Sequence, residues 1–197
     1  MRIGMENRLM QMLTDPELIH TLFTAHAQLI IDIFEGMRDR GLAFDGVFRP
    51  DDLGYNSGPL ISPTLYRDLV MPYHKRLCDH FAERGLKTIL HADGDISRLI
   101  PYFIEAGFKG LHPLEVKAGL DMPTLYDLYG DRLFFFGNID VRALAGTHEE
   151  IEAEIVLDAV EGRDGDVVWA AFIGLSNVHA VAETVRGQDV EAKPATE

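Results

Sequence analysis

The chain has 197 residues, 47% of them hydrophobic, and a formal net charge of −14. This composition indicates a globular protein with one sizeable core, and the acidic surface would repel phosphate backbones, so we expect no nucleic-acid partner. The single cysteine, Cys78, excludes a disulfide framework and a multi-cysteine zinc site within the chain. The sequence contains neither a signal-peptide pattern nor an apolar run long enough to span a membrane, so we expect a cytoplasmic protein.

The first half of the chain predicts two long helices with a strand between them. Each helix begins with a capping residue followed by proline, a pair that favours a helix start. Pro72 lies inside the second helical pattern, and we expect a bend or pause there because proline lacks the amide hydrogen of a helix interior. The expected elements are a helix from Asp15-Pro16 to Gly41, a strand at 43–48, a polar turn at 49–54, and a helix from Ser62-Pro63 over about 64–84.

The second half alternates short apolar strands with helices. Glycines close two of the helices, and Thr147 with Glu150 forms a capping-box pattern at the start of a third. Asp95 and Asp121 are best interpreted as helix N-caps. The expected strands are 87–90, 110–114, 133–136 and 167–173. The expected helices are one ending at Ala106, one from Asp121 to Tyr129, one from Thr147 to about Val160, and one over 177–186.

These elements make about five strand–helix units in a row. The strands are apolar on both faces, as in a sheet covered by helices, and repeated βα units predict a parallel sheet, either doubly wound or closed into a barrel. A complete eight-unit barrel needs roughly 250 residues. We expect a single domain over 1–187 with a disordered tail at 188–197. The sheet would have two raw edges, so either the sheet is open, or another chain supplies the remaining strands, or the chain is a fragment. An unpaired half-barrel is expected to self-associate.

Polar side chains follow four successive strands at the point where each strand ends. Ligands of α/β folds bind at the carboxyl ends of parallel strands, so these residues are expected to converge on one site. They are Asp51 and Asp52; His91, Asp93 and Asp95; Glu115; and Asn138, Asp140 and Arg142.

His91 and Asp93 stand two residues apart, which in a strand points both side chains the same way. Imidazole with carboxylate suits zinc, iron or manganese, and Glu115 or Asp140 would complete the ligand set. The competing interpretation is structural, with His91 bonded to a buried carbonyl and Asp93 or Asp95 capping the following helix.

Other candidates carry weaker signals. Tyr55 and Asn56 lie on a loop near the expected site and either contact substrate or belong to the surface. His112 is as compatible with packing as with catalysis, and Cys78 is expected in the core. The helical histidines are expected on the surface: His20, His26, His74, His80, His148 and His179.

Four stretches of the chain resemble the C-terminal portion of the uroporphyrinogen decarboxylase superfamily over about residues 15–160. The resemblance implies a (β/α)8 barrel of the TIM type, here a partial barrel of about five βα units. The stretches are Ile61-Ser62-Pro63 leading to Val70-Met71-Pro72-Tyr73; Ile89 to Asp95; Gly107 to Glu115; and Tyr129 to Arg132 leading to Phe136-Gly137-Asn138-Ile139-Asp140.

The motif is most similar to the cobalamin-dependent methyltransferase branch of that superfamily, which uses zinc to activate a thiol that takes a methyl group from a corrinoid. His91 matches the histidine ligand of this branch, and Asp93 stands where its first cysteine does. The resemblance therefore implies metal-assisted methyl or one-carbon transfer on a small molecule. The implied roles are metal binding by His91, Asp93 and Glu115, catalysis by Glu115, Asp140 and Asp52, and substrate binding by Tyr55, Asn138 and Arg142.

Two alternatives remain open. The first is decarboxylation of a tetrapyrrole without metal or cofactor, with Arg49 and Arg142 binding carboxylates. The late histidine that the resemblance implies for that reaction is absent from residues 171–175, Ala-Phe-Ile-Gly-Leu. The second is a non-catalytic barrel fragment that binds a corrinoid or porphyrin, forms a homo-oligomer, or pairs with a corrinoid protein or with a chain that carries the missing strands.

Overall fold

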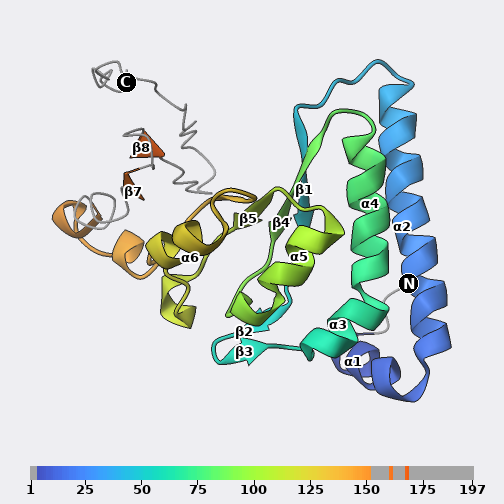
Figure 1. Cartoon of the computed structure of the whole chain (residues 1–197), viewed down its shortest axis with the longest axis horizontal. Helices are drawn as coiled ribbons and strands as arrows, with labels where there is room; N and C mark the ends of the chain where they lie inside the picture. Colours follow the sequence, from blue (N-terminus) through green and yellow to red (C-terminus); the bar gives the residue numbers. More distant parts are fainter. Residues whose placement is uncertain (1–3, 152–159, 162–166, 169–197) are drawn as a thin grey trace.

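The computed structural model describes residues 4–151, 160–161 and 167–168. Its centre is a four-stranded parallel sheet of order β1-β4-β5-β6 (Figure 1). The register aligns the carboxyl ends, because Pro50 pairs with His91 and His91 pairs with His112. The parallel α/β architecture of the prediction is confirmed. The strands are β1 (Gly46–Pro50), β4 (Lys87–His91), β5 (Gly110–His112) and β6 (Phe134–Phe135).

Four helices pack on the β1 side of the sheet, with α2 and α4 lying side by side (Figure 1). The expected caps are present, since the Asp15 carboxylate accepts a hydrogen bond from the Leu18 amide and Ser62 Oγ accepts one from the Leu65 amide. The expected interruption near Pro72 is also confirmed, as one helix ends at Leu69 and the next begins at Met71. The helices are α1 (Met5–Thr14), α2 (Pro16–Arg38), α3 (Pro63–Leu69) and α4 (Met71–Ala82).

Shorter elements complete the described structure. The sequence did not predict α1, nor the hairpin of β2 (Gly54–Tyr55) and β3 (Gly58–Pro59), because both are too short for periodicity to reveal them. The remaining elements are α5 (Ile100–Ala106), α6 (Met122–Tyr129) and the 3₁₀ turns η1 (Ser97–Leu99), η2 (Val116–Ala118) and η3 (Ala143–Ala145). Within the described ranges, no helix combines the length and apolar character needed to cross a membrane.

The main core lies between the sheet and α3, α4 and α5, and its largest members are almost completely shielded from solvent. Burial of each such side chain stabilises the fold by about 1.5–3 kcal/mol. A second cluster, which includes Phe34 and Phe81, joins α2 to α4. Cys78 is buried as expected. The main core includes Tyr66, Leu90, Leu99, Phe103, Phe108 and Leu111.

The expectation for His74 was wrong, because this helical histidine is 2% exposed rather than on the surface. It faces the sheet from α4, where Tyr66 Oη lies 2.8 Å from its Nδ1 and an Asp51 oxygen lies 3.0 Å from its Nε2. Helical position alone could not separate this inward-facing histidine from the exposed ones.

The last expected units differ from the structure. The capping box is confirmed, since the Glu150 carboxylate accepts from the Thr147 amide and Thr147 Oγ1 accepts from the Glu150 amide. However, β7 (Val160–Glu161) pairs antiparallel with β8 (Val167–Val168), so Val160 does not end a helix and the start of the expected fifth strand does not join the parallel sheet. The connection is too short for the crossover that a parallel pair requires. The expected helix at 177–186 and tail at 188–197 lie outside the described residues.

Candidate metal site at the carboxyl ends of the strands

The candidate site lies where β1 and β4 end. Asp52 is the second residue beyond β1, His91 is the last residue of β4, and Asp93 is the second residue beyond β4. The parallel register brings these strand ends to the same edge of the sheet. This is the edge at which α/β folds bind ligands.

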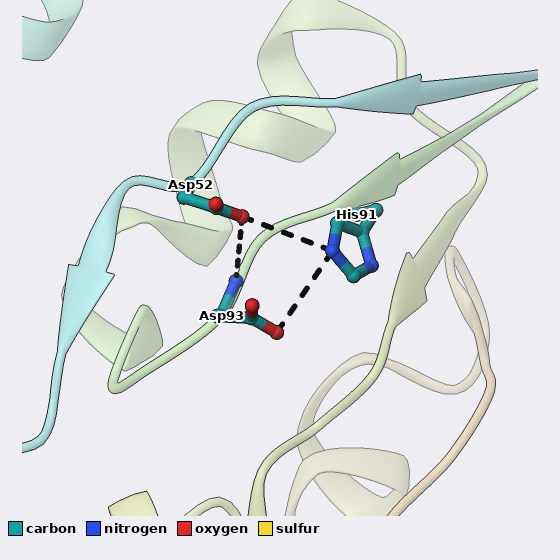
Figure 2. A group of neighbouring side chains, drawn as sticks. All are labelled: Asp52, His91 and Asp93. Atoms are coloured by element: carbon teal, nitrogen blue, oxygen red, sulfur yellow. Dashed lines mark hydrogen bonds and ion pairs between the residues drawn. The ribbon is translucent and has the colours of Figure 1, made fainter. Parts of the chain in front are cut away.

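Asp52, His91 and Asp93 point their polar atoms toward one another (Figure 2). His91 Nε2 lies 3.8 Å from Asp52 Oδ1 and 3.9 Å from Asp93 Oδ1. One potential ligand atom from each residue lies within 4.8 Å of the other two. Ligands on a tetrahedral zinc ion with bonds of 2.0–2.2 Å stand about 3.3–3.6 Å apart, so small side-chain adjustments would suffice to bind one ion.

A close backbone contact fixes the distance between the two acidic loops. A side chain on Gly54 would place its Cβ 2.4 Å from the Asp93 carbonyl oxygen, and one on Gly94 would meet Gly54 at the same distance. The Asp95 amide donates to the Tyr55 carbonyl oxygen at 2.8 Å across this contact. The two glycines therefore let the Asp52 loop lie directly against the Asp93 loop.

His91 is oriented by its neighbours on the adjacent strands. Its Nδ1 lies 2.7 Å from His112 Nδ1, and the exposed Phe48 ring packs near both imidazoles. Burial, together with the nearby His91, lowers the pKa of His112 to about 4, so His112 is neutral at physiological pH. The Nε2 atom of His91 thus remains directed at the two carboxylates, as in metal sites whose histidines are held through the second ring nitrogen.

The site concentrates negative charge. Burial raises the pKa of Asp93, and the neighbouring carboxylates of Asp52 and Glu115 raise it further, against the opposing effects of His91 and Lys117. A bound cation would relieve this repulsion. Two carboxylates and one imidazole form a donor set that zinc, iron or manganese accepts, and a three-residue set leaves coordination positions open for a substrate.

The other residues predicted for the site lie around this triad in different settings. Glu115 accepts a hydrogen bond from the Gly94 amide at 2.7 Å and forms an ion pair with Lys117 at 2.8 Å, which fixes its carboxylate beside the Asp93 loop. Tyr55 is 64% exposed on the β2–β3 hairpin.

The three residues expected after β6 have partners within their own loop or in the neighbouring helix. Asn138 is 7% exposed, has a positive φ of 63°, and accepts the Met122 amide on Oδ1 at 3.2 Å. Asp140 binds Arg142, whose side-chain and backbone hydrogen bonds lower the pKa of Asp140 to about 2. Asp121 caps α6 as expected, because its carboxylate accepts the Thr124 amide at 3.0 Å. The same expectation was wrong for Asp95, which accepts the Ser97 amide two residues on, whereas Ile96 is the residue that precedes η1.

Sequence reasoning assigned neither Asp52 nor His112 the position that the structure gives it. Asp52 was expected as a catalytic residue that lines the site and not as a metal ligand, because its proximity to His91 depends on the register of β1 against β4. His112 had no assigned role, although its position opposite His91 in that register would have revealed the contact.

Comparison with known proteins gives a consistent assignment. The uroporphyrinogen decarboxylase (URO-D) family profile matches residues 1–169. A methylated-thiol–coenzyme M methyltransferase from Methanosarcina mazei is 29% identical over 152 residues, which cover 75% of this chain and 38% of the relative. A uroporphyrinogen decarboxylase from Xylella fastidiosa is 25% identical over 157 residues, covering 76% of this chain and 41% of the relative.

The chain thus spans about two fifths of the length of these relatives. A solved structure of a methyltransferase from Methanosarcina mazei superposes with a TM-score of 0.62 at 20% identity, over 76% of this chain and 42% of that one. This likeness establishes the fold, a portion of a TIM-barrel-type architecture. The family profile covers most of the chain, and the chain therefore belongs to the uroporphyrinogen decarboxylase family.

Proposed function

We propose that this chain contributes a metal site for methyl or one-carbon transfer to a small molecule. The observation that carries the proposal is the convergence of Asp52, His91 and Asp93 at the carboxyl ends of β1 and β4. The methyltransferase among the relatives supports this direction. Zinc is the ion that we propose, because the donor set accepts it and the motif resembles the zinc-using branch, with Asp52 taking the ligand position first expected for Glu115.

Asp52, His91 and Asp93 would hold the ion, and His112 would keep the His91 ring in its binding orientation. Zinc at this position would supply Lewis-acid activation, which lowers the pKa of a bound thiol or water. Glu115 is the proposed acceptor of the substrate proton, because its carboxylate is fixed beside Asp93 by Gly94 and Lys117.

The methyl donor in this proposal is a corrinoid, presented free or by a corrinoid protein. Tyr55 lies on the exposed hairpin next to the site and is proposed to contact the substrate. Asn138, Asp140 and Arg142 would shape the wall after β6. A second copy of the chain, or another chain, would supply further barrel strands next to β1 or β6, the two edges of the described sheet.

Decarboxylation of a tetrapyrrole is the second candidate, because a uroporphyrinogen decarboxylase is also among the relatives. Charge at the strand ends weighs against it. The carboxylates of Asp52, Asp93 and Glu115 would repel a polycarboxylate, and the nearby Lys117 is already paired with Glu115. A non-catalytic barrel fragment is the third candidate.

The test is zinc affinity of the purified chain, measured by competition with a chromophoric chelator beside elemental analysis. Wild type is expected to bind one zinc ion per chain, and His91→Ala, Asp52→Asn and Asp93→Asn should each weaken binding by at least about tenfold. Asp121→Asn is the matched control, because it removes the same charge yet keeps a residue that caps helices well.

If the wild-type chain binds no zinc, iron or manganese, or if all three variants bind as tightly as the control, the metal site is wrong. With a functional metal site, methylcobalamin and a simple thiol provide the next assay. Loss of methyl transfer in Glu115→Gln with zinc content unchanged would support the proton-acceptor role.

A further inference from the structure

A second cavity lies on the helix-covered side of the β1 end. It borders the candidate metal site at Asp52, whose carboxylate lies beside His91. The cavity has a volume of about 250 Å³ and lies among α1, α2, α4, the end of β1 and the segments that follow β1 and β3. Its polar lining residues are Arg8, His26, Arg49, Asp51, Asp52, Tyr73 and His74. The rest is mostly apolar, with Phe23, Met12, Leu53, Ile61, Val70 and Leu77 among the lining residues.

Two guanidinium groups in this cavity have unmet hydrogen-bonding capacity. The Nε atoms of Arg8 and Arg49 are both buried and have no hydrogen-bond partner among the described residues. A buried donor without an acceptor is costly, and more so when it belongs to a charged group. An acceptor that enters the cavity with negative charge would satisfy both.

The charges around the cavity leave an excess of about one positive charge. Asp51 lies 3.8 Å from Arg49 and accepts from His74, so its carboxylate offsets one of the two arginines. The side chain of Asp52 lies instead beside His91, on the other side of the segment. Arg8 remains without a carboxylate within 4.0 Å among the described residues.

We propose that this cavity binds a small monocarboxylate with an apolar body. Arg8 and Arg49 would hold the carboxylate, since planar guanidinium groups match carboxylate geometry, and the apolar wall around Phe23 and Met12 would hold the remainder. His26 lies at the rim of the cavity, where partial burial and the neighbouring Arg49 lower its pKa, so it adds a neutral hydrogen-bonding group. The volume of about 250 Å³ is slightly below the usual range for ligand pockets and limits the ligand to a few carbons or a single ring.

This inference goes beyond the proposed metal chemistry and does not depend on it. The probe is benzoate, compared with its uncharged isostere benzamide and with inorganic phosphate, titrated into the full chain by calorimetry. Benzoate is expected to bind with 1:1 stoichiometry, and benzamide at least about tenfold more weakly. Amide resonances mapped by NMR should shift at Arg8, Phe23 and Tyr73 and not at His91.

Arg8→Gln and Arg49→Gln should each reduce benzoate affinity at least about tenfold, while the control Arg67→Gln, an exposed arginine on α3, should leave it unchanged. Equal binding of benzamide, binding of phosphate alone, or absence of benzoate binding to the wild-type chain would each overturn the proposal. Because the comparison of ligands and the NMR map use only the wild-type chain, they decide the matter even if an arginine variant fails to fold.

Discussion

Substitution of Gly54 by alanine tests whether backbone contact sets the geometry of the metal site. The added Cβ would lie 2.4 Å from the Asp93 carbonyl oxygen and 2.7 Å from the Gly94 carbonyl carbon, where real Cβ contacts essentially never fall below 3.0 Å. The two loops must therefore separate by about 0.6 Å, the difference between 3.0 and 2.4 Å. Ligand positions in metal sites tolerate only about ±0.2 Å.

We expect Gly54→Ala to weaken zinc binding by about 10–100-fold, as for lesions that misplace ligands without removing them. Overlap in a packed region should also lower the free energy of unfolding by about 1–3 kcal/mol. For a chain of this size, each 1 kcal/mol corresponds to a fall in Tm of about 2–4 °C.

The assay pairs chelator competition with thermal denaturation, and the matched control is Gly36→Ala. Gly36 lies inside α2, and its added Cβ would meet only the end of the flexible Arg40 side chain at 3.3 Å. The control should keep wild-type zinc affinity and gain up to about 1 kcal/mol of stability, because alanine favours helices. Wild-type zinc affinity and Tm in Gly54→Ala would show that the two loops do not touch as described.

Three further predictions concern buried groups outside the metal triad. Tyr66→Phe should lower the free energy of unfolding by about 1–3 kcal/mol, because it leaves the buried Nδ1 of His74 without its partner; denaturant titration measures this, and an unchanged midpoint would contradict it. Burial raises the pKa of the Cys78 thiol to about 12, so at pH 8 only about one thiol in 10⁴ is ionised. A disulfide reagent should therefore react with Cys78 only after denaturation, and rapid reaction with the native chain would argue against this burial. Asn138→Ala should destabilise by about 1–3 kcal/mol, since alanine disfavours a φ of 63° and removes the acceptor of the Met122 amide, while Asn138→Gly should lose less if the backbone strain matters.

Local signals in the sequence were sufficient for most of the parallel sheet and its helices. Proline after a capping residue marked the starts of α2 and α3, and apolar runs marked β4, β5 and β6. The end of the described chain could not be predicted in the same way, because one apolar stretch near Val167 fits either a parallel strand or one arm of a hairpin. The choice depends on the length of the connection and on the pairing partner rather than on the stretch itself.

The candidate site was predictable in its location but not in its exact membership. The two-residue spacing of His91 and Asp93 indicated a shared direction, which the structure shows. The proximity of Asp52 depends on the pairing of β1 with β4 and on two glycines that meet across loops. Glu115 follows a neighbouring strand as expected, yet local hydrogen bonds hold its carboxylate at Gly94 and Lys117. No pattern along a single sequence contains these distances.

Asp51 and Asp52 point to opposite sides of the same segment. The Asp51 carboxylate faces His74 and the helices, and the Asp52 carboxylate faces His91. A single residue inserted into or deleted from β1 would exchange the two carboxylates, since side chains alternate with a period of two. It would place the wrong acid in each environment and damage the buried histidine network and the metal triad in one step. A change in the length of the segment between Gly46 and Gly54 should therefore be more damaging than the substitution of any one of its side chains.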